Sequence, residues 1–114
     1  MHELSLAQAI LGHVESRAHG RPVRRVQVRI GYLRQVVPDS LSFAWEMLTD
    51  DTDLAGTELV VEHIPAVVHC RVCDRDTTLD WPVLACAGCE GHDVSLRQGD
   101  ELDVATIDVA QEVR

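Results

Sequence analysis

The chain has 114 residues, enough for one compact domain together with a small additional module. Hydrophobic residues make up 46% of it and charged residues 25%, which is typical of a globular protein and excludes a disordered tail. Its 19 acidic and 10 basic residues give a formal net charge of −9, which disfavours nucleic acid as a partner.

Targeting signals are not evident in the sequence. The apolar runs are too short to cross a bilayer, and the N-terminus lacks the basic and apolar regions of a secretory signal. We therefore expect a cytoplasmic protein with no membrane partner. Most of the negative charge lies in residues 36–114, which suits a protein that handles cations or docks on basic partners.

The first predicted element is an α-helix over residues 4–18. Apolar residues recur there at helical spacing, and Gly20 and Pro22 are typical of the end of a helix. The residues expected on its buried face are Leu4, Ala7, Leu11, Val14 and Ala18, with Leu6 and Ile10 beside them.

A strand and a second helix are predicted next. Val26, Val28 and Ile30 alternate with polar residues, which is typical of a half-buried strand with an arginine-rich outer face. That outer face is either a solvated surface or a docking surface. The following helix starts near Pro38 with a cap from Asp39 or Ser40, and its expected buried residues are Leu41, Ala44, Trp45 and Leu48.

Two further strands are predicted, in "TELVVEHI" and in "DELDVATIDVAQEV". Between them lies a cysteine-containing segment with few large apolar residues. The predicted fold class is α+β, with two helices packed on a three-stranded sheet and an inserted zinc-ribbon-like module. The expected domains are 1–66 together with 100–114, and a zinc module over 67–99.

The four cysteines form two Cys-x-x-Cys motifs, Cys70 with Cys73 and Cys86 with Cys89. Two such turns facing each other supply four thiolates in the tetrahedral arrangement that zinc prefers. Four protein ligands leave no open coordination position, so we expect a structural zinc site. Binding of zinc contributes about 10–16 kcal/mol in small zinc peptides, which would compensate for the small apolar core.

Two histidines lie close to these motifs. His69 directly precedes Cys70, and His92 follows Cys89 by three residues. Each is either an exchangeable zinc ligand or, as we favour, a polar surface residue.

The opening Met1-His2-Glu3 offers nitrogen donors at chelating spacing. The amine of Met1 and the backbone nitrogen of His2 would form a five-membered ring with a metal ion. That nitrogen and Nδ1 of the imidazole would form a six-membered ring. Three nitrogens near one plane favour Ni(II) or Cu(II) over zinc. Glu3 either supplies a fourth donor or interacts favourably with the helix dipole.

Together, the opening "MHELSLAQAI", the C-x2-C-x12-C-x2-C module and the strand "GDELDVATIDV" resemble the HypA/HybF family of hydrogenase nickel-incorporation proteins. The resemblance implies that Met1, His2 and Glu3 carry nickel and that Cys70, Cys73, Cys86 and Cys89 carry zinc. It also implies transfer of Ni(II), with a HypB-type GTPase, to the large-subunit precursor of a nickel–iron hydrogenase. The turns "CRVCDR" and "CAGCEG" depart from the Cys-x-x-Cys-Gly and Cys-Pro-x-Cys forms frequent in that family.

Two other function classes fit the sequence less well than a carrier. The alternative is a zinc-ribbon module that binds protein or nucleic acid without transferring nickel, but the acidic module lacks clustered aromatic residues for base stacking. A zinc hydrolase or deaminase needs an open zinc position, which four cysteine ligands do not leave. We therefore expect no enzymatic activity.

Overall fold

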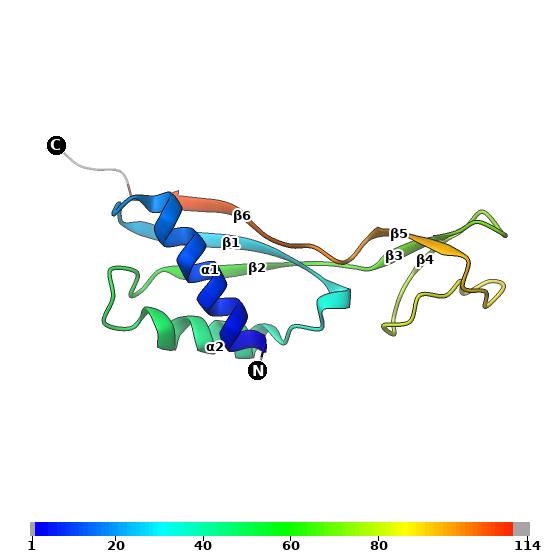
Figure 1. Ribbon diagram of the computed structural model, residues 1–114, viewed down its shortest axis with the longest axis horizontal. Helices are drawn as coiled ribbons and strands as arrows, with labels where there is room; N and C mark the ends of the chain where they lie inside the picture. Colours follow the sequence, from blue (N-terminus) through cyan, green and yellow to red (C-terminus); the bar gives the residue numbers. More distant parts are fainter. Residues whose placement is uncertain (1, 111–114) are drawn as a thin grey trace. The chain divides into compact units, whose positions relative to one another are not determined.

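The computed structural model describes residues 2–110. The elements are α1 (His2–Ala18), β1 (Val23–Gly31), a 3-10 helix η1 (Tyr32–Arg34), α2 (Pro38–Thr49), β2 (Glu58–Ile64), β3 (Val67–Cys70), β4 (Asp76–Thr78), β5 (Val94–Gln98) and β6 (Leu102–Val109) (Figure 1). The strands form two three-stranded sheets, ordered β2-β1-β6 and β4-β3-β5. The α+β class with two helices is confirmed.

The chain divides into two compact units, and each is described by itself. The first unit comprises Met1–Val28, Val36–Glu62 and Asp103–Arg114, as far as these are described. The second unit comprises Arg29–Gln35 and His63–Leu102, and it contains all four cysteines. The domain boundaries expected from the sequence, 1–66 with 100–114 and 67–99, stay a prediction.

The sheet of the first unit is mixed. The side chain of Arg25 bonds that of Glu58, and further along both strands the side chain of Gln27 bonds that of Glu62, so β1 and β2 run parallel, with α2 in the connection between them. The N–H of Ala110, just after β6, donates to the carbonyl of Pro22, just before β1 (2.9 Å), so β6 runs antiparallel to β1.

Helix α1 packs against α2, and its buried face matches most of the predicted one. The helix starts at His2, and its buried residues are Glu3, Ala7, Ile10, Val14 and Ala18. Ala7, Ile10, Val14 and Ala18 are buried as predicted, whereas Leu4 is exposed, Leu11 is half-buried, and Glu3 is buried instead. Among residues 2–110, neither helix combines the length and apolar character needed to cross a membrane.

Helix α2 buries most of the residues predicted to face the core. Leu41, Ala44 and Trp45 are buried, whereas Leu48 is half-buried and Thr49 takes the remaining buried position. The indole N–H of Trp45 donates to the carbonyl of Thr57 (3.0 Å), so it is satisfied inside the core. This bond fixes α2 to the chain just before β2.

The second unit has a sheet that the sequence pattern did not predict. Strand β3 pairs antiparallel with both β4 and β5. The buried residues of its core are Ala66, Val68 and Leu79, and the half-buried residues packed on them are Tyr32, Leu33, Val94 and Leu96. The apolar positions are too few and too widely spaced along the sequence to reveal this sheet, and Tyr32 and Leu33 of η1 complete its core from a distant part of the chain.

Candidate metal centres

The two Cys-x-x-Cys turns have the same backbone hydrogen bonds. In each turn the N–H of the first cysteine donates to a carbonyl five residues later, and its carbonyl accepts from an N–H four residues later. These bonds join Cys70 to Arg75 (2.9 Å) and Asp74 (3.0 Å), and Cys86 to Gly91 (2.9 Å) and Glu90 (2.9 Å). Each turn therefore presents its two sulfurs in the same way, as the sequence repeat suggests.

The four sulfur atoms lie together as a zinc site requires. All four Sγ atoms are within 4.8 Å of one another. The pairs Cys70–Cys89 and Cys70–Cys73 are 3.7 Å apart, and Cys73–Cys86 are 3.5 Å apart. A tetrahedron with Zn–S bonds of about 2.3 Å has S–S edges of about 3.8 Å. The cysteine cluster therefore fits one tetrahedral zinc ion.

Backbone N–H groups favour the thiolate form of the first cysteine in each turn. Sγ of Cys70 accepts from the N–H of Cys73 (3.4 Å), and Sγ of Cys86 accepts from that of Gly88 (3.3 Å). The N–H of Cys73 lowers the pKa of Cys70, and the N–H of Cys89 lowers the pKa of Cys86 to about 6. Hydrogen bonds with the thiols of Cys89, Cys86 and Cys70 raise the pKa of Cys73 to about 12. Zinc binding requires all four sulfurs as thiolates, so it releases the protons that the thiols carry.

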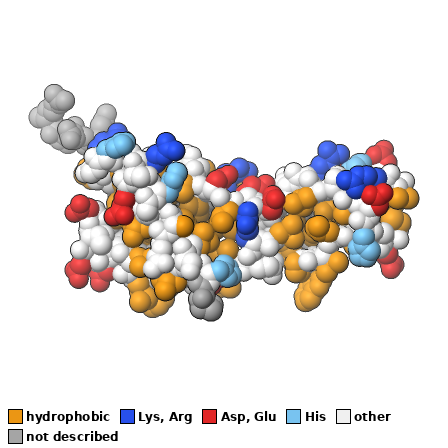
Figure 2. Space-filling view, viewed as in Figure 1, with side chains coloured by type: hydrophobic (Ala, Val, Ile, Leu, Met, Phe, Trp, Pro, Cys, Tyr) orange, Lys and Arg blue, Asp and Glu red, His pale blue; other side chains and the backbone are white. Residues whose placement is uncertain are grey.

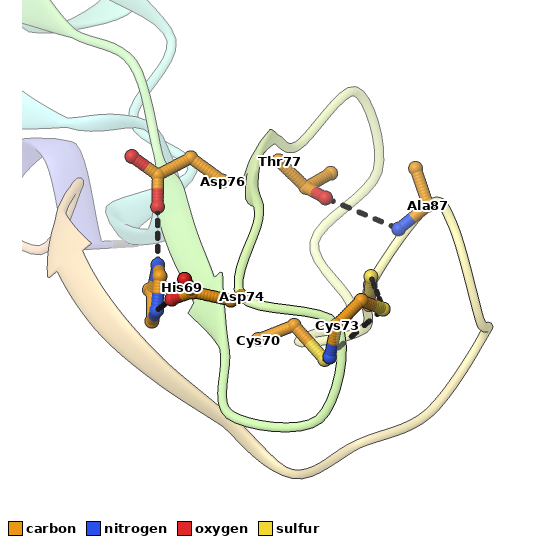
Figure 3. Close-up of polar contacts among 8 residues, drawn as sticks. His69, Cys70, Cys73, Asp74, Asp76, Thr77 and Ala87 are labelled. Atoms are coloured by element: carbon orange, nitrogen blue, oxygen red, sulfur yellow. Dashed lines mark hydrogen bonds and ion pairs between the residues drawn. The ribbon is translucent and has the colours of Figure 1, made fainter.

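Neither neighbouring histidine belongs to the sulfur cluster. Nδ1 of His69 lies 2.7 Å from the carboxylate of Asp76, and Nε2 lies 2.9 Å from that of Asp74. Figure 3 shows His69 pointing toward these carboxylates and away from the cysteines. Nδ1 of His92 lies 3.1 Å from the carbonyl of Leu84. Both histidines are thus polar residues near the zinc turns in this arrangement, which agrees with the favoured interpretation.

Contacts outside the cluster support the two turns, and the sequence reasoning missed them. The N–H of Ala87 donates to the hydroxyl of Thr77 (3.1 Å), which ties the second turn to β4 (Figure 3). The guanidinium of Arg71, just after β3, lies 2.7 Å from the carboxylate of Asp93, just before β5. The only sequence signal for the pair Arg71–Asp93 was opposite charge, which does not identify partners, and the contact between Ala87 and Thr77 had none.

The N-terminal site is described only from His2 onward, because Met1 lies outside the described residues. Nε2 of His2 lies 3.1 Å from Oε2 of Glu3, and the His2 side chain is 56% exposed. This contact engages Nε2, which the predicted chelate does not use, and leaves Nδ1 available. The first N–H groups of a helix also have no carbonyl partner within the helix, which leaves the backbone nitrogens of His2 and Glu3 available.

Glu3 is buried, and it caps a helix other than its own. Its side chain is 8% exposed, and Oε2 accepts from the N–H of Val37, the residue before α2 (3.2 Å). This N–H holds the pKa of Glu3 below its usual range despite burial. The predicted cap by Asp39 or Ser40 is wrong, because α2 has no such side-chain cap and begins at Pro38. Since Glu3 and Val37 are 34 residues apart, no local pattern could have paired them.

Comparison with family models matches residues 1–109 to the family described as "Hydrogenase/urease nickel incorporation, metallochaperone, hypA". A protein from Desulfosudis oleivorans named hydrogenase maturation factor HypA is 36% identical over 115 residues, covering 97% of this chain and all of that protein. One of the same name from Solidesulfovibrio magneticus is 46% identical over 94 residues, covering 80% of each chain.

Solved structures share the fold. The solution structure of the nickel metallochaperone HypA from Helicobacter pylori aligns with a TM-score of 0.64 at 18% identity, covering 96% of this chain and 98% of that one. A second HypA solution structure aligns with a TM-score of 0.67 at 20% identity, covering 98% of both chains. The arrangement of helices and sheets described above is therefore that of known HypA structures.

Proposed function

Because the chain belongs to the HypA family of hydrogenase/urease nickel-incorporation metallochaperones, we propose that it carries Ni(II) for hydrogenase maturation and has two unlike metal sites. The observation that carries this proposal is the match over residues 1–109, which includes both the Met-His-Glu opening and the four cysteines. The protein acts as a carrier and not as a catalyst.

Nickel binds at the N-terminus in this proposal. The amine of Met1, the backbone nitrogen of His2 and Nδ1 of its imidazole are the first three donors, and Glu3 supplies the fourth. The contact between Nε2 of His2 and the carboxylate of Glu3 supports this arrangement, since it orients the ring with Nδ1 available. Exposure of His2 suits a site that has to release its metal to another protein.

Zinc binds to Cys70, Cys73, Cys86 and Cys89, and its role is structural. The S–S distances and the paired N–H···S bonds support this assignment. Four sulfur ligands leave no position for a substrate or for nickel. When bound, zinc crosslinks the two turns and so stabilises the small core of the second unit.

Delivery completes the proposed role. In the cytoplasm, the protein would work with a HypB-type GTPase and pass Ni(II) to the large-subunit precursor of a nickel–iron hydrogenase. The HypA names of the relatives support a place in hydrogenase maturation.

Calorimetric titration with Ni(II) tests the proposed site. Untagged, zinc-loaded protein is compared with a version that has one extra residue before Met1. The extension leaves His2 and Glu3 chemically intact and moves only the amine, so we expect it to abolish tight nickel binding. The control is a His13→Ala variant, which removes an exposed histidine on the same helix and should bind nickel normally.

Equal nickel binding by the extended and the original protein would overturn the N-terminal site. Loss of binding in the His13 variant would show instead that nickel uses a histidine further along α1.

A further inference from the structure

Helix α2 exposes two large apolar side chains that no contact in the first unit explains. Phe43 is 64% exposed and Met47 is 61% exposed. Because they are four residues apart, they lie next to each other on the helix surface. Figure 2 shows hydrophobic side chains projecting along the edge of the molecule over α2. Phe and Met are among the side chains enriched in the cores of protein interfaces.

Three carboxylates lie along one side of this pair. Asp39, Glu46 and Asp50 are exposed and lie on the same outward side of α2 by helical spacing. Within residues 2–110, none of the three carboxylates forms an ion pair. No Lys or Arg occurs between residues 35 and 70. The surface formed by Phe43, Met47 and these carboxylates, the α2 surface, is therefore an apolar pair with a negative border along one side.

The charge of the α2 surface selects the kind of partner. A phosphate backbone or an anionic membrane would be repelled by the three carboxylates. A protein surface with an apolar recess bordered by Lys or Arg would be attracted and correctly oriented by them. The occupant that fits is therefore a cationic protein surface.

The α2 surface also lies near the proposed nickel ligands within the first unit. The carboxylate of Glu3 contacts the N–H of Val37, which joins the start of α1 to the start of α2. Phe43 is six residues after Val37, or about 9 Å along the helix axis. A protein bound at Phe43 would therefore lie close to the proposed nickel ligands.

We propose that the α2 surface is the docking site of the protein that exchanges nickel with this carrier, and that this protein presents an apolar recess bordered by basic residues. The inference rests on the proposed function, which it deepens by naming the surface used. A second exposed apolar group, Trp81 with Val83 and Leu84, lies in the second unit, and no observation connects it to nickel.

The test uses the zinc-loaded full chain and two purified probes, the HypB-type GTPase and the hydrogenase large-subunit precursor. A Phe43→Ser/Met47→Ser variant removes the apolar pair, and Glu46→Lys reverses one charge while keeping that pair. Trp81→Ser, at a residue 71% exposed in the second unit, is the matched control. Binding is measured by calorimetry between about 50 mM and about 500 mM salt, and nickel affinity is measured separately for each variant.

We expect the double variant to bind at least one probe about tenfold more weakly or worse, with nickel affinity unchanged. Glu46→Lys should slow association, salt should weaken the wild-type complex, and Trp81→Ser should behave as wild type. The helix content of each variant, measured by circular dichroism, separates lost docking from lost folding. All four substituted side chains are exposed, so we expect normal folding.

The inference is overturned if the double variant, correctly folded, binds both probes as wild type does. It is also overturned if Trp81→Ser alone loses binding, or if sedimentation shows that the α2 surface joins two copies of this chain. If the wild-type protein binds nickel but neither probe, both the proposed docking site and the proposed partners are wrong. If instead the probes bind the α2 surface but the N-terminus does not bind nickel, the docking site is supported and the proposed nickel site is wrong.

Discussion

Oε2 of Glu3 accepts a hydrogen bond from the backbone N–H of Val37 at 3.2 Å. In a capping box, a glutamate in the first turn of a helix bonds the N–H of the residue that precedes the same helix. Here the glutamate comes from α1 and the N–H precedes α2, so one side chain orders the starts of two helices. The same oxygen lies 3.1 Å from Nε2 of His2, which links this bond to the proposed nickel site.

Substitution of Glu3 tests this bond. We expect Glu3→Ala to lower the melting temperature, because it leaves a half-buried N–H without its acceptor, whereas Glu3→Gln keeps an acceptor oxygen and should lose less. Amide hydrogen exchange of Val37 should be faster in the alanine variant. Unchanged exchange at Val37 would mean that the bond does not hold the start of α2.

Nickel affinity should fall as the pH is lowered from about 7.5 to about 6. The amine and imidazole donors have to lose their protons to bind Ni(II), so protons compete with the metal. Calorimetric titrations at several pH values, with zinc content checked in each sample, measure this directly. A constant affinity over that range would contradict the ligand set of amine and imidazole.

Removal of one sulfur ligand should release zinc and disorder the second unit. We expect Cys89→Ser to lower the zinc stoichiometry and broaden the NMR signals of the core around Val68, since that core is small. Val72→Ser is the matched control, because Val72 lies between two cysteines but is 72% exposed. A Cys89 variant that retained zinc and ordered signals would show that the cluster does not depend on four sulfurs.

Replacement of Glu90 by glycine should stabilise the second zinc turn. Glu90 has a φ of 61°, a left-handed conformation that strains a side chain other than glycine. We expect Glu90→Gly to raise the free energy of unfolding by about 1 kcal/mol, measured by denaturant titration of the zinc-loaded protein. Glu46→Gly, inside α2, should do the opposite by about the same amount. If Glu90→Gly instead lowers the free energy of unfolding, the Glu90 side chain stabilises the folded turn by more than its left-handed backbone conformation costs.

The close approach of Gly99 to Ala66 leaves no room for a side chain. Gly99 has a φ of 121°, and a Cβ there would lie 2.4 Å from Cα of Ala66. We expect Gly99→Ala to destabilise the second unit by more than about 2 kcal/mol. Gly12→Ala is the control, because a Cβ there meets nothing within 4 Å and should stabilise α1 slightly. Thermal unfolding of both variants measures the difference, and equal melting temperatures would disprove the steric argument.

Features encoded over a few residues were predictable from the sequence. The two Cys-x-x-Cys turns each form by bonds between residues at most five positions apart, so their spacing alone indicated that they would present paired sulfurs. The alternation of Val26, Val28 and Ile30 likewise gave the correct buried face of β1, because side chains of a strand alternate between its two faces.

Contacts between distant residues were decided only by tertiary packing. The periodicity of α1 identified Ala7, Ile10, Val14 and Ala18 as buried, but the burial of Glu3 in place of Leu4 depends on its bond to the N–H of Val37, just before α2. The partners of His69 follow from the return of the chain through β4. Sequence patterns report which residues prefer burial or bind metal, whereas the choice among several acceptable partners depends on how the elements pack.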